Sequence, residues 1–200
     1  MANPAASLRA FFDQAAPGWA ARQVDYGLLE WLLDRLDWAS GQRVLDLGGG
    51  TGHLVAALRR RVGAAGRIAL VDLSPCMLRH AAAPATAAGA LRCCAVAEAL
   101  PLRPGTWDTV IGMGLYPHLA DRDAALAQIA AVLAPQGQLA FMHLIGRQRL
   151  NQLHSGMGYP VARHLLPPAV EVAAALRRAG FAVTCALDEE DRYLVAGRRQ

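Results

Sequence analysis

The chain has 200 residues, and 54% of them are hydrophobic, which excludes a disordered protein and is enough to build one packed core. The formal net charge is +4. The 20 basic residues, all arginine, are scattered along the chain rather than gathered in a stripe, so no nucleic-acid partner is expected. No uncharged apolar run of about 18 residues occurs, so no membrane involvement is expected.

The cysteines and the start of the chain bear on the cellular compartment. Four cysteines occur, at positions 76, 93, 94 and 185, and none forms a C-x-x-C pair, so no disulfide framework is expected. Residues 1–16 contain Asp13 and no long apolar core, which is unlike a secretory signal peptide. Together these features predict a cytoplasmic protein.

The first elements in chain order are helices, and strands follow. Residues 8–38 carry apolar side chains at helical spacing, and Pro17-Gly18 is expected to divide them into two helices. From residue 44 onward, short aliphatic runs alternate with longer helical stretches. Strands are expected at 44–47, 68–71, 91–96, 109–113 and 139–143. Helices are expected at 54–62, from Ser74-Pro75 to about Ala83, and from Asp121 to near Pro135.

The last third of the chain begins with its longest irregular stretch, residues 144–167. A stretch of that length is typical of a lid or a binding loop. A helix is expected at 168–179, ended by Gly180, and strands are expected at 181–186 and 193–196. The turn between these two strands is too short for a crossover helix, so the strands should pair antiparallel.

Alternation of strands and helices predicts an α/β fold with right-handed crossovers. The expected architecture is a Rossmann-like, doubly wound, seven-stranded sheet, mostly parallel with an antiparallel final strand and with helices on both faces. We expect one domain made of four parts. They are a helical lid at 1–40, a cofactor-binding core at 41–145, a substrate loop at 146–167, and a C-terminal helix with a strand pair at 168–200.

A glycine-rich loop follows the first predicted strand and indicates a ligand site. Glycines allow positive φ and let a ligand approach the backbone, and the next helix directs its N-terminus at the same place. A dinucleotide loop has the spacing G-x-G-x-x-G. Here Gly48 and Gly50 fit this spacing, but the third position is His53, and the glycine comes one residue earlier, at Gly52.

The segment Val44-Leu45-Asp46-Leu47-Gly48-Gly49-Gly50-Thr51-Gly52 resembles motif I of the class I S-adenosylmethionine-dependent methyltransferases, of the ubiquinone/menaquinone-methyltransferase-like type. Further segments resemble the same family in the same order. They are Val71-Asp72-Leu73-Ser74, 97–102, 105–108 and 125–141, so that the resemblance covers about residues 40–145. The chain departs from the family at Val96, where an Asp that binds the adenine amino group is frequent.

The resemblance implies S-adenosylmethionine as the cofactor. It implies that Asp72 binds the ribose hydroxyls and that Leu73 packs on the adenine. With Val96 in place of Asp, adenine recognition is assigned to the backbone near Ala97 or to Glu98, although Glu98 can equally be a solvent-facing carboxylate. The cofactor-binding residues expected are Asp46, Gly48, Gly49, Gly50, Gly52, Asp72, Leu73, Ala97, Glu98 and Met113.

The acceptor of the methyl group is expected above the ends of the fourth and fifth strands. His118 and His143 fall there, and His154 lies in the irregular stretch; a neutral imidazole can take a proton from an acceptor near pH 7. Either of the first two can instead be a hydrogen-bonded structural residue. No carboxylate accompanies the histidines at ligand spacing, so no metal is expected. Trp19 and Tyr26 are candidates to cover the cofactor.

These patterns predict an enzyme that transfers a methyl group from S-adenosylmethionine to a small-molecule acceptor by in-line displacement, with a homodimer as the oligomer to consider. Two alternatives stay open at this point. One is an NAD-dependent oxidoreductase on the same sheet topology, and the other is a non-catalytic cofactor-binding subunit of another enzyme.

Overall fold

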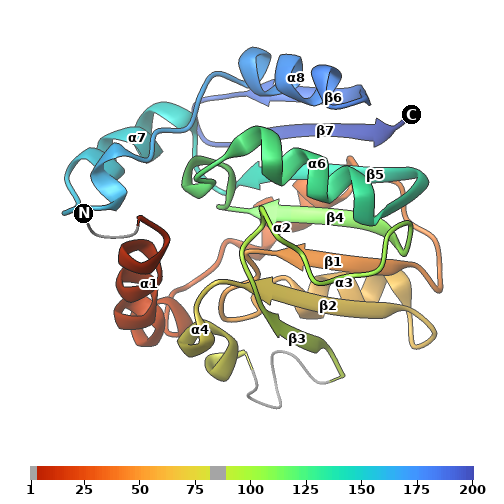
Figure 1. Cartoon of the computed structure of the whole chain (residues 1–200), viewed down its shortest axis with the longest axis horizontal. Coiled ribbons are helices and arrows are strands. Elements are labelled where there is room, and N and C mark those ends of the chain that lie inside the picture. Colours follow the sequence, from red (N-terminus) through yellow and green to blue (C-terminus); the bar gives the residue numbers. More distant parts are fainter. Residues whose placement is uncertain (1–3, 82–88) are drawn as a thin grey trace.

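The computed structural model describes residues 4–81 and 89–200 and contains one seven-stranded sheet (Figure 1). The strand order is β3-β2-β1-β4-β5-β7-β6. The strands are β1 (Arg43–Leu47), β2 (Arg67–Asp72), β3 (Leu91–Cys94), β4 (Trp107–Met113), β5 (Leu133–His143), β6 (Phe181–Asp188) and β7 (Tyr193–Arg199).

The first five strands are parallel, and β7 pairs antiparallel with both β5 and β6. The predicted fold class is therefore confirmed. Strand β1 lies between β2 and β4, so the strand order reverses there, and a ligand of an open α/β sheet binds at such a reversal.

Helices cover both faces of the sheet because side chains of one strand alternate between two apolar clusters. Leu45 and Leu47 of β1 belong to one cluster, whereas Val44 belongs to the other. The helices are α1 (Pro4–Ala20), α2 (Tyr26–Leu33), α3 (Val55–Val62), α4 (Pro75–His80), α6 (Arg122–Val132), α7 (Arg147–Ser155) and α8 (Ala169–Arg178), with 3-10 turns η1 (Tyr116–His118) and η2 (Val161–Arg163). Helices α6 and α8 pack on the first cluster, and α2 and α3 pack on the second. In Figure 1, α1, α4 and α7 lie at the left, where the parallel strands end.

The predicted helix break at Pro17-Gly18 is wrong, because α1 continues through Pro17 to Ala20. A proline in a helix removes one backbone hydrogen bond. Here packing offsets that loss, since Ala16 is fully buried and the Trp19 ring packs edge-on against Phe12 at 6.0 Å. The break instead precedes α2, where the Asp25 side chain accepts a hydrogen bond from the Leu28 amide.

The expectation that residues 144–167 are irregular is also wrong, because they contain α7 and η2. Leu150 and His154, one helical turn apart, both line the molecule's large cavity. The Asn151 side chain holds the following segment, exchanging hydrogen bonds with the amide and the carbonyl of Leu166. Arginine and glutamine dominate this helix, which hid its periodicity.

Element ends differ from the predictions by a few residues. Strand β5 begins at Leu133 rather than 139 and contains the predicted turn as a local irregularity in which Gln136 has a φ of 63°. The helix expected to reach about Ala83 is seen as α4 up to His80; Ala83 lies outside the described residues.

Candidate functional site

One large cavity lies at the carboxyl ends of the parallel strands. Its volume is about 740 Å³, within the range of small-molecule sites. The last residues of four neighbouring strands line it: Leu47 of β1, Asp72 of β2, Met113 of β4 and His143 of β5. The cavity thus spans the point where the strand order reverses.

The glycine loop forms one wall of this cavity. Gly48, Gly50 and Gly52 have φ values of 70°, 54° and 82°, a conformation that L side chains rarely adopt. Gly48 and Gly50 line the cavity, whereas Gly49 and Gly52 do not. A Cβ atom on Gly50 would have no neighbour closer than 3.9 Å, so the backbone there is open to a ligand.

Asp72 at the end of β2 connects the glycine loop to α4. Its Oδ2 accepts a hydrogen bond from the Gly50 amide at 2.9 Å, and its Oδ1 accepts one from the Ser74 amide at 2.8 Å. Burial raises the pKa of the carboxyl, and the two amide donors partly oppose this effect. Each carboxylate oxygen keeps acceptor capacity that can be offered to a hydroxyl group in the cavity.

Asp46 lies beneath the loop and does not line the cavity. Its side chain is buried and neither carboxylate oxygen has a hydrogen-bond partner within the described residues. Burial, together with the nearby charge of Asp72, raises its pKa to about 8. A Cβ atom on Gly49 would lie 2.9 Å from the Asp46 Cγ, so Gly49 is a glycine because Asp46 and Leu70 pack against it.

The remaining residues expected around the cofactor line the cavity as a group: Leu73, Ala97, Glu98 and Met113. Glu98 has a structural bond as well. Its Oε1 accepts hydrogen bonds from the amides of Ala120 and Asp121, which ties the segment after β3 to the start of α6. Val96, at the position where the family often has an Asp, also lines the cavity and brings no polar side chain to it.

Five of the six histidines of the chain line the cavity. His53 directly follows Gly52 of the glycine loop, and the other four, His118, His143, His154 and His164, come from later segments. His143 ends β5, His118 lies in η1, and His154 and His164 come from the segment that holds α7 and η2. The structure thus brings the three histidines singled out in the sequence to one wall.

The His118 ring contacts two of the other histidine rings. The ring centroid of His118 lies 5.1 Å from that of His154 and 5.2 Å from that of His164. The Nδ1 atoms of His118 and His164 are 2.9 Å apart, which is a hydrogen bond. His154 Nδ1 donates to the backbone oxygen of His164, since a carbonyl only accepts.

Burial holds three of these histidines neutral. Burial, together with the neighbouring histidines, lowers the pKa of His118 to about 3. Burial also lowers the pKa of His143 to about 3; its Nε2 is buried and has no hydrogen-bond partner within the described residues. The pKa of His164 is lowered by burial as well. Near pH 7 these rings present lone pairs and N–H groups rather than positive charges.

Sequence reasoning missed several residues in the cavity and beside it. His53 approaches the backbone oxygen of Trp19 with its Nε2 at 3.0 Å, and the Phe12 ring packs edge-on against His118 at 5.2 Å. Asp13 accepts hydrogen bonds from the Ser74 hydroxyl and the Cys76 amide, which fastens α1 to α4. Trp19 lines the cavity as expected, whereas Tyr26 is half exposed and does not line it.

Neither a metal centre nor a membrane-spanning helix was found within residues 4–81 and 89–200. No three His, Cys, Asp or Glu side chains there are arranged to hold a metal ion, despite the proximity of the histidines. The same part of the chain has no helix long and apolar enough to cross a membrane.

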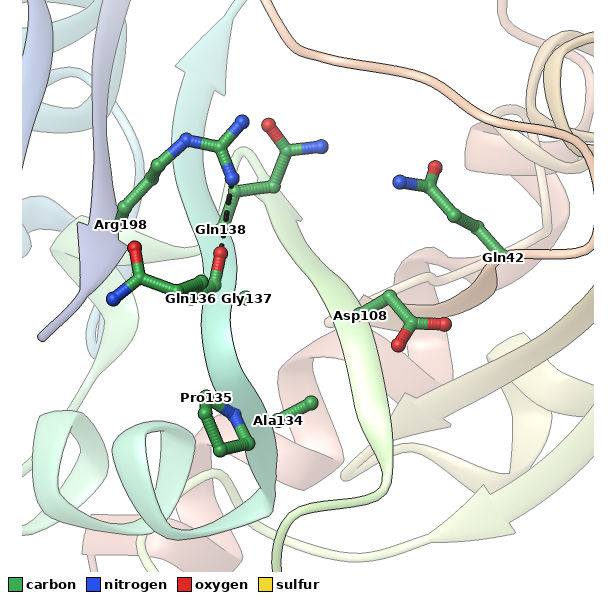
Figure 2. Close-up of a pocket in the computed structure, with 8 residues that line it drawn as sticks. All are labelled: Gln42, Asp108, Ala134, Pro135, Gln136, Gly137, Gln138 and Arg198. Atoms are coloured by element: carbon green, nitrogen blue, oxygen red, sulfur yellow. Dashed lines mark hydrogen bonds between the residues drawn. The ribbon is translucent and has the colours of Figure 1, made fainter.

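A second pocket, of about 270 Å³, lies at the amino ends of the parallel strands (Figure 2). Its charged side chains already have partners. Arg198 donates to the backbone oxygen of Gln136, and Asp108 binds the Arg43 guanidinium at 2.8 Å. This pocket contains no histidine and lies at the end of the sheet away from the glycine loop.

Known proteins resemble both the sequence and the fold. Residues 44–137 match a family model described as a methyltransferase domain. A malonyl-[acyl-carrier protein] O-methyltransferase from Geobacter sulfurreducens is 34% identical, covering 91% of this chain and 72% of that protein. A ubiquinone/menaquinone biosynthesis C-methyltransferase from Cronobacter sakazakii is 33% identical, covering 67% of this chain, which spans about half (54%) of that relative's length.

The crystal structure of an S-adenosylmethionine-dependent methyltransferase from Aquifex aeolicus aligns with a TM-score of 0.74. The alignment covers 92% of this chain and 98% of that one at 21% identity, which shows a shared fold. These relatives are methyltransferases, so they favour the methyltransferase over the two alternatives that the sequence left open, the oxidoreductase and the non-catalytic subunit. The chain belongs to the class I S-adenosylmethionine-dependent methyltransferases and is an enzyme.

Proposed function

We propose that this methyltransferase acts on a neutral, largely apolar small molecule that binds between α1, α7 and the ends of β4 and β5. The observation that carries the proposal is that one continuous cavity joins the glycine loop to the histidine wall. Its two ends differ in chemistry, and each suits one of the two reactants.

The end formed by β1 and β2 fits the cofactor. Gly48 and Gly50 line this end at positive φ, the backbone at Gly50 is open to a ligand, and Asp72 offers carboxylate oxygens to vicinal hydroxyls. Leu73, Ala97, Glu98 and Met113 are assigned to the adenine and the remainder of the nucleoside. Asp46, Gly49 and Gly52 are assigned an indirect role, because they shape the loop from beneath. When bound, S-adenosylmethionine supplies a methyl group activated by the positive charge on sulfur.

The other end of the cavity is apolar and suits the acceptor. The apolar side chains that line it come from α1, the connection after β5, and α7 with the turn that follows it, and they are Leu8, Phe12, Leu144, Ile145, Leu150, Leu153 and Met157. Burial of apolar surface contributes roughly 25 cal/mol per Å², so this wall favours an acceptor with a ring or an alkyl chain.

The charges around the cavity argue against an anionic acceptor. Among the described residues that line it, Arg22 is the only Lys or Arg, and it lies in the connection between α1 and α2. A carboxylate acceptor, such as a malonyl group, needs a cation or several donors when it is removed from water. The histidines do not supply that charge, because burial holds His118 and His143 neutral. This favours an acceptor of the kind named for the C-methyltransferase relatives over one like that of the malonyl relative.

We expect the histidines to lie next to the atom of the acceptor that receives the methyl group. His118, His143 and His154 lie on the wall beside the end of β4, where the methyl group must be presented if the ribose lies at Asp72. The neutral rings of His118 and His143 do not repel a cationic sulfonium and can accept a hydrogen bond from an acceptor hydroxyl. Most of the catalytic effect is expected to come from proximity and orientation of the two reactants.

Three further expectations belong to this proposal. Absence of a nucleic-acid partner is supported by the partners of the Arg59-Arg60-Arg61 run: Arg60 and Arg61 bind Glu30, and Arg59 donates to backbone oxygens. A cytoplasmic location is supported by the four free cysteines. A homodimer is the oligomeric state to test by light scattering.

A neutral and an anionic acceptor test the proposed function. The protein is incubated with S-adenosylmethionine and either 4-octylphenol, which is neutral and aromatic, or octanoate, which is an anion with an alkyl chain of similar length, and the methylated product is measured by mass spectrometry. We expect methylation of the phenol and not of octanoate. Preferential methylation of octanoate would contradict the proposal.

A cation introduced at the apolar end of the cavity tests the charge argument. Leu153→Arg changes a cavity-lining residue that is 48% exposed, so the fold should tolerate the substitution. The variant should shift the acceptor preference toward octanoate. Leu91→Arg, at a residue that is 66% exposed on β3 and does not line the cavity, is the control and should leave the preference unchanged.

A further inference from the structure

We propose that His118 and His164 form a relay that carries the proton of the acceptor out of the cavity to solvent. His164 is not among the catalytic residues that the sequence predicts, and its role rests on the proposed function of the cavity. The inference starts from the 2.9 Å contact between the Nδ1 atoms of the two rings.

A relay is needed because methyl transfer to an acceptor atom that carries hydrogen releases one proton. The bond between the methyl carbon and sulfur breaks with its electron pair left on sulfur, and the acceptor forms a bond to that carbon. The acceptor then loses its proton. His118 is a poor store for this proton, since burial and the neighbouring histidines lower its pKa to about 3.

The geometry of the pair allows His118 to pass a proton without becoming charged. Two imidazole nitrogens in hydrogen-bond contact share one hydrogen, so one Nδ1 donates and the other accepts. If His118 donates, its Nε2 carries a lone pair. Uptake of the acceptor's proton at Nε2 and transfer of the Nδ1 proton to His164 leave His118 neutral in its other tautomer. His164 then releases a proton from its Nε2 to water or a buffer base.

The surroundings of the two rings favour transfer from His118 toward His164. On its inner side, His118 packs edge-on against the Phe12 ring, with the ring centroids 5.2 Å apart. His164 lies in the outer segment between Arg163 and Leu165, both of which are exposed. The remaining ring contact of His118 is with His154, whose Nδ1 proton is committed to the backbone oxygen of His164. Of the two neighbouring rings, His164 is therefore the one whose Nδ1 can receive a proton.

The same contacts make a clean substitution available. His154 binds the backbone oxygen of His164 rather than its side chain, so His164→Ala keeps that anchor and removes only the relay. His80→Ala is the matched control, because His80 is exposed on α4 and does not line the cavity.

The experiment measures turnover of 4-octylphenol and the ¹⁵N spectrum of histidine-labelled protein. We expect His164→Ala to lower kcat at least about tenfold, with little change in KM, and added imidazole to restore it, since general acid–base steps contribute about 10²- to 10⁴-fold. His80→Ala should behave as the native protein. A His164→Ala variant with native kcat, or one whose lost activity imidazole does not restore, would overturn the relay.

The spectrum tests the relay even if 4-octylphenol proves not to be an acceptor. In the native protein with S-adenosylhomocysteine, we expect one of the two Nδ1 atoms to be protonated and His118 to stay neutral down to pH 5. His164→Ala should shift the His118 Nδ1 resonance. Two unprotonated Nδ1 atoms would show that no hydrogen is shared and would overturn the relay, whereas failure to methylate either acceptor affects only the proposed function.

Discussion

Asp72 is the residue whose substitution tests the cofactor end most sharply, because its two carboxylate oxygens have different backbone partners. Oδ2 accepts from the Gly50 amide and Oδ1 from the Ser74 amide. Asp72→Ala leaves both amides without this acceptor and removes the oxygens assigned to the ribose. Asp72→Asn can satisfy only one amide, since its NH₂ group would face the other, so the isosteric change should also be damaging.

The magnitude follows from the cost of leaving the ribose hydroxyls without their acceptor in the complex, about 1–3 kcal/mol for a buried polar group without a partner. Both variants should therefore bind S-adenosylhomocysteine about 5- to 150-fold more weakly, since each 1.4 kcal/mol is tenfold in Kd. Isothermal titration calorimetry measures the affinity, and Asp123→Asn, exposed on α6, is the control. An Asp72→Asn variant with native affinity would refute the reasoning about the two amides.

Three further predictions concern the loop and the buried titratable groups. Gly50→Ala should weaken cofactor binding and lower the free energy of unfolding by about 1 kcal/mol. Gly49→Ala should mainly destabilise the fold, as measured by thermal unfolding, because its Cβ would meet Asp46 at 2.9 Å. Equal effects of the two variants on stability would contradict this. Asp46 stays protonated in the folded protein up to about pH 8 but ionises near pH 3.8 when the chain is unfolded, so the free energy of unfolding should fall as the pH rises through this window. Asp46→Asn should reduce that fall, which urea titrations at pH 5 and pH 8 measure. His143 should have the opposite effect on the pH dependence of stability. Its ring takes up a proton below pH 6.5 in the unfolded state and only near pH 3 in the folded state, so the free energy of unfolding should drop by about 2–3 kcal/mol between pH 6.5 and 4.5. His143→Gln should remove this contribution. A pH dependence of unfolding identical to that of the native protein in either variant would count against the buried group concerned.

The sheet and the cofactor end could be predicted because their signals are local. The run 44–52 contains both the buried strand and the glycines, and Asp72 ends the next strand, so parallel topology places them together. The roles of Asp46 and Gly49 were less visible, because whether a loop residue faces the cavity or packs beneath it depends on the fold of the loop.

The acceptor end depends on contacts between distant segments, which spacing in the sequence does not reveal. His118 and His164 are 46 residues apart, and their contact requires α7 to fold back over η1. Helix α7 was missed because a histidine, rather than an apolar side chain, is its buried residue. Pro17 was misread because the packing of Ala16 and Trp19 overrides the local preference of proline.

A crystal structure of the protein with S-adenosylhomocysteine and 4-octylphenol tests the arrangement of the two reactants most directly. We predict the ribose hydroxyls on Asp72, the alkyl chain against Leu150 and Leu153, and the phenol oxygen on the histidine wall. A phenol bound outside the cavity, or a nucleoside placed at the histidines with the acceptor at Asp72, would contradict the assignment of the two ends.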